Sequence, residues 1–272
     1  TPKPLLEEHE VVYLPSATTL ISQRRRLALR PEAPRRAYVL ADPVFSADDP
    51  RVAEAASAKG SAPAKEARDA VRQAGGLLPA FERLPGTRRE AETIAGLAAA
   101  GEVRTALDFA ASREAVLAED LRSFRVVHFA THGVADTRNP VLTGLVLSLV
   151  DAAGRPREGF LGLSDIRQLD LAADLVVLSG CRTAFGKEVR GEGLMGLTRG
   201  FLSAGARRVV ASLWQVQDRA AAELMARFYR GMWRNGLAPA AALREAQRSL
   251  RREPRYRDPY FWSGFVLQGD WR

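Results

Sequence analysis

Two positions in this sequence carry the side chains that nucleophilic catalysis requires. Cys181 is the sole cysteine among 272 residues and follows the apolar run Leu-Val-Val-Leu-Ser-Gly. His132 ends a second run, Val-Val-His-Phe-Ala-Thr, and precedes Gly133. A thiolate is the nucleophilic form of cysteine, and a neighbouring imidazole can take its proton. The pattern predicts Cys181 as nucleophile and His132 as base, with the N–H groups of Gly133 and Cys181 stabilising an oxyanion.

A third residue, His128, precedes His132 on the same predicted strand. The two-residue period of a strand places both histidines on one face, with His128 deeper in the sheet. We therefore expect His128 to be buried and hydrogen-bonded. A zinc site made from His128, His132 and Cys181 would lack a fourth ligand and the usual closely spaced pair. No metal or organic cofactor is expected.

Three further residues are candidates for substrate binding. Asp218 follows Leu-Trp-Gln-Val-Gln at the end of a predicted strand, so it could bind a basic substrate side chain. It is equally well placed to cap the helix that begins at Arg219, and we favour the cap because Asp is a preferred N-cap. Trp214 could wall the cleft or pack in the core, and Asp42 follows another strand. These acidic residues slightly favour a substrate with Arg or Lys before the scissile bond. A preference for an aliphatic residue at that substrate position stays an open alternative.

A glycine string offers a rival interpretation. Residues 191–196 read Gly-Glu-Gly-Leu-Met-Gly, open a predicted helix, and have Asp218 further along the chain. A dinucleotide site uses this order of parts, but its first glycine directly follows a strand. Here residues 181–190 intervene, so a dinucleotide-binding α/β protein is kept as a less favoured alternative.

The elements that must position these residues alternate along the chain. Strands are predicted at residues 9–14, 37–41, 105–109, 125–131, 174–179, 208–213 and 261–267, with a hairpin formed by 145–150 and 160–163. Helices are predicted at residues 87–100, opened by a capping box of Thr87 and Glu90, from Ser112 to 121, and at 193–204, 219–234 and 239–252. This order predicts a doubly wound, mainly parallel sheet with helices on both faces, whose strand tips share one edge.

Composition limits the organisation and setting of the protein. The length suits a single domain over residues 1–272, with a mobile insertion around 46–84 that holds a short helix near 65–74. The chain begins at Thr1 without Met, so we expect it to be the C-terminal part of a longer protein. One cysteine leaves no internal disulfide and indicates a cytoplasmic protein. No apolar run is long enough for a membrane span.

The net charge of +8 raises the question of nucleic-acid binding. Only four of the 40 basic residues are lysines, and the arginines are spread along the chain. The densest basic run, residues 24–26, has no aromatic residue beside it. We therefore expect no direct nucleic-acid partner and no membrane partner.

Four motifs together resemble the CHAT domain, a caspase- and separase-like cysteine peptidase module often fused to tetratricopeptide repeats. They are His-Phe-Ala-Thr-His-Gly ending at Gly133, Leu-Ser-Gly-Cys-Arg-Thr-Ala around Cys181, Gly-Leu-Thr-Arg-Gly-Phe-Leu-Ser-Ala-Gly-Ala ending at Ala206, and Val-Val-Ala-Ser-Leu-Trp-Gln-Val-Gln-Asp ending at Asp218. The resemblance implies a caspase-like fold, a dyad at His132 and Cys181, and cleavage of selected protein targets. It also implies a regulatory or tetratricopeptide region N-terminal to the domain.

The same resemblance suggests a biological setting, and one position of this sequence departs from the family pattern. Some bacterial members are similar to defence proteases that cleave gasdermin-like pore formers or act with RNA-guided effectors, which suggests antiviral defence or programmed cell death. The family more often has Ala where this sequence has Gly180. Many members look inactive, and a catalytically silent, caspase-like interaction module is therefore the second hypothesis.

Overall fold

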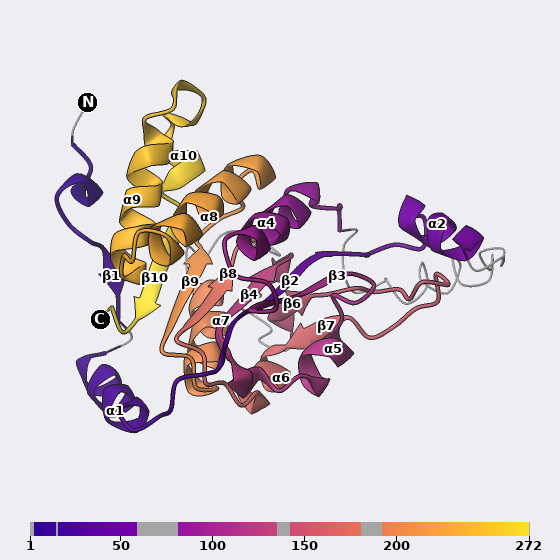
Figure 1. Ribbon diagram of the computed structural model, residues 1–272, viewed down its shortest axis with the longest axis horizontal. Coiled ribbons are helices and arrows are strands. Elements are labelled where there is room, and N and C mark those ends of the chain that lie inside the picture. Colours follow the sequence, from indigo (N-terminus) through magenta and orange to yellow (C-terminus); the bar gives the residue numbers. More distant parts are fainter. Residues whose placement is uncertain (1–2, 15, 59–80, 135–141, 181–191, 272) are drawn as a thin grey trace.

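A seven-stranded sheet forms the centre of the molecule (Figure 1). The computed structural model describes residues 3–14, 16–58, 81–134, 142–180 and 192–271. The strand order is β1-β10-β9-β8-β4-β2-β3. In that order the strands are Val12–Tyr13, Phe265–Gly269, Arg208–Ser212, Leu175–Leu178, Phe124–Ala130, Arg35–Pro43 and Val103–Asp108. Neighbouring strands run parallel, except that β10 is antiparallel to β9. The predicted mainly parallel sheet is confirmed.

Helices cover both faces of this sheet, as predicted. Figure 1 shows α4, α8, α9 and α10 on one side, and these are Pro85–Gly96, Asp218–Trp233, Pro239–Arg251 and Pro259–Trp262. The other side carries α5, α6 and α7, which are Arg113–Ala118, Leu163–Gln168 and Glu192–Ser203. Among the described residues, no helix has the length and apolar character that crossing a bilayer demands.

Alternation along β4 explains why the sheet is buried on both faces. Val126 and Ala130 belong to the core cluster under α4, α8 and α9, whereas Val127 and Phe129 belong to the cluster under α6 and α7. Successive strand residues point to opposite faces, so an apolar run supplies both layers at once. This packing buries the middle of β4 in apolar layers on both faces, with His128 as a buried polar residue.

A second, smaller sheet lies beside the tip of β4. Its strands β5, β6 and β7 are Gly133–Val134, Gly144–Val146 and Phe160–Gly162, and they pair antiparallel. The predicted hairpin is therefore present, with the N–H of Gly154 donating to the carbonyl of Asp151 in its turn. Strand β5 begins at Gly133, so His132 is the residue directly before this second sheet.

The peripheral elements differ from the prediction in several places. The first strand shortens to Val12–Tyr13 at the sheet edge, after the 3-10 helix η1 (Leu5–Glu7) and before α1 (Ala17–Leu27). Short 3-10 helices also occur at η3 (Leu121–Ser123) and η5 (Pro254–Tyr256). The last strand begins at Phe265, because Asp258 caps the short helix α10 before it. These are local effects of caps and prolines that hydrophobic patterning does not resolve.

The predicted insertion around 46–84 contains a helix that patterning did not locate. Helix α2 spans Pro50–Ala58, and its Val52 and Ala56 are buried. Val52 packs in a small cluster with Val44 and Val150. The helix predicted near residues 65–74 lies outside the described residues.

Candidate active site

The tips of β4 and β8 are packed against each other. Phe129 and Leu178 are in register, and the N–H of Ser179 donates to the carbonyl of Phe129 at 3.0 Å. A Cβ built on Gly180 would lie 2.4 Å from the carbonyl oxygen of Thr131. A side chain at position 180 would collide with this backbone, so the close approach of the two strand tips requires glycine here.

This close approach determines where the next residues leave the sheet. His132 follows Thr131, and Cys181 follows Gly180. Cys181 itself lies outside the described residues, so its side chain is not placed. The two chain segments that carry the predicted nucleophile and base therefore leave the sheet from neighbouring strand tips.

His132 is contacted by groups from two segments, residues 81–82 and the segment that carries Phe45. It is 2% exposed, and its Nε2 lies 2.7 Å from the carbonyl oxygen of Glu82. Its ring packs against Phe45 and Phe81, with centroid distances of 5.2 and 5.3 Å. A carbonyl only accepts hydrogen bonds, so Nε2 carries the proton. In the neutral ring Nδ1 is then the basic nitrogen.

A cavity of about 600 Å³ opens beside His132. Its polar lining brings together residues from the 81–90 region, the β8 tip and the segment before α8. The lining consists of Glu82, Arg83, Leu84, Pro85, Thr87, Glu90, His132, Ser179, Gly180, Gln215, Val216, Gln217, Asp218, Ala221, Tyr260 and Phe261. Clefts of this size accept a side chain of a peptide, so the cavity is a candidate substrate pocket.

Asp218 contributes a carboxylate to this pocket, and the cap that the sequence favoured does not form. It does not cap α8: Gln217 is at the N-cap position without a side-chain cap, and the Asp218 carboxylate accepts the N–H of Gly86 at 2.5 Å. A Cβ on Gly86 would lie 2.6 Å from that carboxyl group. Burial raises the pKa of Asp218, opposed by the Gly86 hydrogen bond and reinforced by Glu90.

Glu90 is a second pocket carboxylate, and its role corrects the sequence interpretation. The predicted capping box of Thr87 and Glu90 does not form, because α4 begins at Pro85 with Leu84 at the N-cap. Glu90 is 2% exposed, and its Oε2 accepts the hydroxyl of Ser179 at 3.1 Å. Thr87 instead accepts the N–H of Asp42 and donates to the carbonyl of Leu84.

His128 is buried and hydrogen-bonded, which confirms the prediction. Its Nδ1 lies 2.8 Å from the hydroxyl of Tyr229, and its Nε2 lies 2.8 Å from Oε1 of Glu90. Burial raises the pKa of Tyr229 well above its usual value, so this hydroxyl stays protonated. Both ring nitrogens of His128 face protein partners, which leaves neither for the zinc alternative.

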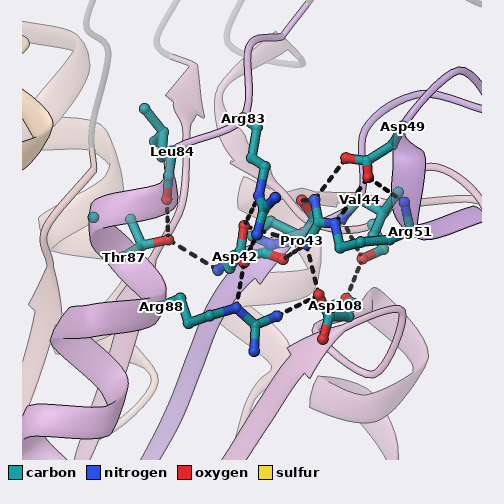
Figure 2. Close-up of polar contacts among 12 residues, drawn as sticks. Asp42, Pro43, Val44, Asp49, Arg51, Arg83, Leu84, Thr87, Arg88 and Asp108 are labelled. Carbon is teal, nitrogen blue, oxygen red and sulfur yellow. Dashed lines mark hydrogen bonds and ion pairs between the residues drawn. The ribbon is translucent and has the colours of Figure 1, made fainter. Parts of the chain in front are cut away.

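Asp42 is not part of the pocket. It is fully buried at the tip of β2, where Arg83 forks onto its two oxygens at 2.9 and 2.7 Å and Arg88 donates at 2.8 Å (Figure 2). The charged side chains around Asp42 are arginines and aspartates that form ion pairs with one another. We call this set the arginine cluster: Asp42, Asp49, Asp108, Arg51, Arg83 and Arg88. The carboxylates of this cluster are neutralised by its own arginines, so Asp42 is not a substrate ligand in this arrangement.

Trp214 lies behind the pocket lining. Its indole N–H donates to the carbonyl of Tyr260 at 3.0 Å, and the two rings stack. Tyr260 lines the cavity, so Trp214 supports the wall from behind. Glu82, Glu90 and Tyr260 were not singled out as site residues from the sequence; Glu90 alone had a signal, the Thr-x-x-Glu spacing, which was assigned to capping.

The alternatives involving a cofactor find little support in the described residues. Within those residues no group of three or more His, Cys, Asp or Glu side chains is arranged to hold a metal ion. Gly191, the first glycine of the rival string, lies outside them. Asp218, the acid of that proposed dinucleotide site, is hydrogen-bonded to Gly86.

Solved structures reproduce the fold at low sequence identity. The Arg-specific cysteine proteinase gingipain R matches with a TM-score of 0.54 at 8% identity, covering 94% of this chain and 52% of that chain. The separase of Saccharomyces cerevisiae, in its complex with securin, matches with a TM-score of 0.48 at 14% identity, covering 97% of this chain and 14% of that chain. The first of these supports a caspase-like peptidase fold.

Sequence comparisons identify the family. Tetratricopeptide repeat protein 28 of Mus musculus is 39% identical over 113 residues, and that of Homo sapiens is 37% identical over the same length. Each match covers 42% of this chain and 4% of the relative, so the chain spans a small part of these proteins. The family model of the CHAT domain matches residues 1–270. This chain belongs to the CHAT domain family.

Proposed function

We propose that this chain is a cysteine endopeptidase that uses Cys181 as nucleophile and His132 as base. The supporting observation is the contact between Gly180 and Thr131, from which the two residues leave adjacent strand tips. The tautomer of His132 agrees with this role, because the Glu82 carbonyl keeps Nδ1 as the basic nitrogen. The adjacent pocket offers space for a substrate side chain.

The chemistry follows from these groups. Nδ1 of His132 takes the thiol proton as Sγ of Cys181 bonds to the peptide carbonyl carbon. The N–H groups of Gly133 and Cys181 stabilise the resulting oxyanion. The imidazolium then gives its proton to the departing amine, and water hydrolyses the thioester with His132 again acting as base. These reaction steps need no metal or organic cofactor.

The pocket favours an Arg or Lys residue before the scissile bond. Asp218 and Glu90 both line it, while the guanidinium of Arg83 is engaged by Asp42. A substrate cation would face the Asp218 carboxylate in partly desolvated surroundings, with the buried charge of Glu90 adding to the negative potential, and an ion pair is stronger there than in water. The proteinase gingipain R is described as Arg-specific, which is a preference of the same kind.

Alkylation of the sole cysteine tests the catalytic pair. Iodoacetamide or a peptide chloromethyl ketone is expected to label Cys181 rapidly at neutral pH, and mass spectrometry locates the adduct without ambiguity. His132→Ala should slow the labelling, whereas His9→Ala, which alters an exposed histidine, should not. Equal labelling rates in all three proteins would rule out an activated thiol.

Peptide hydrolysis tests the substrate class. Fluorogenic peptides that differ only in Arg, Lys or Leu before the cleaved bond should show the highest kcat/KM for the basic residues. Asp218→Asn should lower kcat/KM for the Arg peptide by roughly tenfold to a hundredfold, the range expected for a lost hydrogen bond to a charged group. A preference for Leu that Asp218→Asn leaves unchanged would contradict this assignment.

The cellular role is proposed from the family resemblance. It comprises a protein target, a cytoplasmic location, and a place in bacterial antiviral defence or programmed cell death with a gasdermin-like or similar substrate. The relatives named as tetratricopeptide repeat proteins support a neighbouring repeat region as a regulatory partner. Cys181→Ala separates this proposal from a silent interaction module, because only the module would keep its full biological effect in that variant.

A further inference from the structure

A backbone carbonyl accepts the hydrogen bond of Nε2 of His132 and so keeps Nδ1 as its basic nitrogen. Glu82 supplies that carbonyl from the segment formed by residues 81–84, which runs over the imidazole before α4 begins. Phe81 packs on the ring of His132 on one side of Glu82. On the other side, the side chain of Arg83 and the carbonyl of Leu84 attach the segment to the rest of the molecule. Whatever holds this segment also determines the orientation of the imidazole.

The strongest of these attachments is the fork between Arg83 and Asp42. Two parallel hydrogen bonds, at 2.9 and 2.7 Å, join the guanidinium to a carboxylate that is fully buried (Figure 2). Bidentate Arg–carboxylate pairs fix geometry as well as distance. Asp42 is held in turn: its N–H donates to Thr87, and its carboxylate contacts Arg88 and Arg51.

The backbone at Asp42 is unusual in a way that fits a rigid support. Its φ is 50°, and the strand register shifts between Ala41 and Pro43. Left-handed backbone at a residue other than glycine costs energy and persists where neighbouring groups determine it. Three arginines around one buried carboxylate, among the described residues, provide that determination. The result is a fixed point beside the segment that carries Glu82.

We propose that Asp42 and Arg83 are positioning residues for His132, acting through the Glu82 carbonyl. The fork holds residues 81–84 in the position from which the Glu82 carbonyl accepts a hydrogen bond from Nε2–H of His132. The proton then stays on Nε2, and Nδ1 stays available as the base. This proposal rests on the proposed peptidase function for its consequence, but the placement of the His132 proton can be measured without any activity.

The test uses nuclear magnetic resonance of 15N-histidine in the full chain. The sequence contains three histidines, so His132 can be assigned by comparison with His132→Ala. The spectra are recorded in a Cys181→Ala background, where no thiol can donate a proton to the ring. In this background we expect the His132 signals of the tautomer protonated at Nε2.

Arg83→Ala is the decisive variant. Arg83 is 40% exposed, which makes its removal compatible with folding. Without the fork, the His132 nitrogen signals are expected to move toward the average of the two tautomers, and Arg83→Lys should show an intermediate shift because it keeps the charge without the fork. With Cys181 present, Arg83→Ala should slow its alkylation by roughly tenfold, the scale of a lost orienting contact.

Arg113→Ala is the matched control. Arg113 makes the same kind of fork with Asp165, at 3.0 and 2.9 Å, and has no contact with His132 or the 81–84 segment among the described residues. It should leave the His132 spectrum unchanged. Unchanged His132 signals in Arg83→Ala would overturn the proposal, even with a reactive Cys181. A shifted spectrum together with an unreactive wild-type thiol would uphold the positioning role and reject the peptidase function.

Discussion

Asp42 and Asp218 both lie close to strand tips of the central sheet, yet they have opposite surroundings. Asp42 is fully buried among Arg51, Arg83 and Arg88. Asp218 is half-buried at the pocket, and the partner recorded for its carboxylate is the N–H of Gly86. A carboxylate whose counter-ions contact it within the fold supports structure, whereas one that lines a cavity and is hydrogen-bonded to a backbone N–H can bind a cation from outside.

The same contrast appears in protonation. Burial by itself would raise the pKa of Asp108 in the arginine cluster, but hydrogen bonds from Arg88 and Arg51 outweigh it and lower that pKa. At Asp218 burial is the largest influence and the pKa is raised. Burial therefore has opposite results at the two carboxylates, decided by whether guanidinium groups donate hydrogen bonds to them.

The largest expected effect is on folding stability at the arginine cluster. Asp42→Asn would leave three guanidinium groups around a neutral side chain, and losing one member of a buried ionic network costs about 3 kcal/mol. Urea unfolding should show this as a lower midpoint with an unchanged slope. Asp218→Asn should change the midpoint far less. Equal losses in the two variants would remove the distinction between these carboxylates.

A smaller effect is expected where Asp218 meets α4. Gly86→Ala would place a Cβ 2.6 Å from the Asp218 carboxyl group, and overpacking of this kind costs about 2 kcal/mol. The double variant Gly86→Ala/Asp218→Ala should recover most of the loss, because it removes the colliding group. Denaturant unfolding of all four proteins gives the coupling energy. Additive losses would place the strain elsewhere than at this contact.

The smallest effect is the pH dependence that Asp218 contributes. Its folded pKa lies above the value of 3.8 for an unperturbed Asp, so the folded state binds its proton more tightly than the unfolded state. Its contribution is therefore most favourable at low pH and declines as the pH rises from near 3.8 through the folded pKa. Measured across this range, Asp218→Asn should gain stability relative to wild type as the pH rises. A relative loss would reverse the sign of the shift.

The elements around the site could be predicted because their patterns are long and regular. The strands carrying His128 and Val177 are apolar on both faces, and this is what a buried parallel strand requires. The burial of His128 follows from the same two-residue period. The start of α4 was less accurate and α10 was not predicted, since caps and prolines decide these short features locally.

The polar contacts of the site were harder to predict, because they join residues far apart in the chain. Thr87 and Glu90 have the spacing of a capping box, but their side chains serve Asp42 and Ser179 instead. Asp218 has the position of an N-cap, but it binds Gly86 on another helix. A local pattern cannot show a competing partner that only the packed sheet brings near.

The sequence by itself determined the kind of fold and the chemically reactive side chains, since alternating apolar runs define the sheet and its tips must be polar or small. Tertiary structure alone decided which acid faces the pocket, which is neutralised by arginines, and that the carbonyl of Glu82 orients His132. The physical reason is that electrostatic roles depend on distance in space, and residues 42, 82, 132 and 218 become neighbours only when the sheet and α4 pack together.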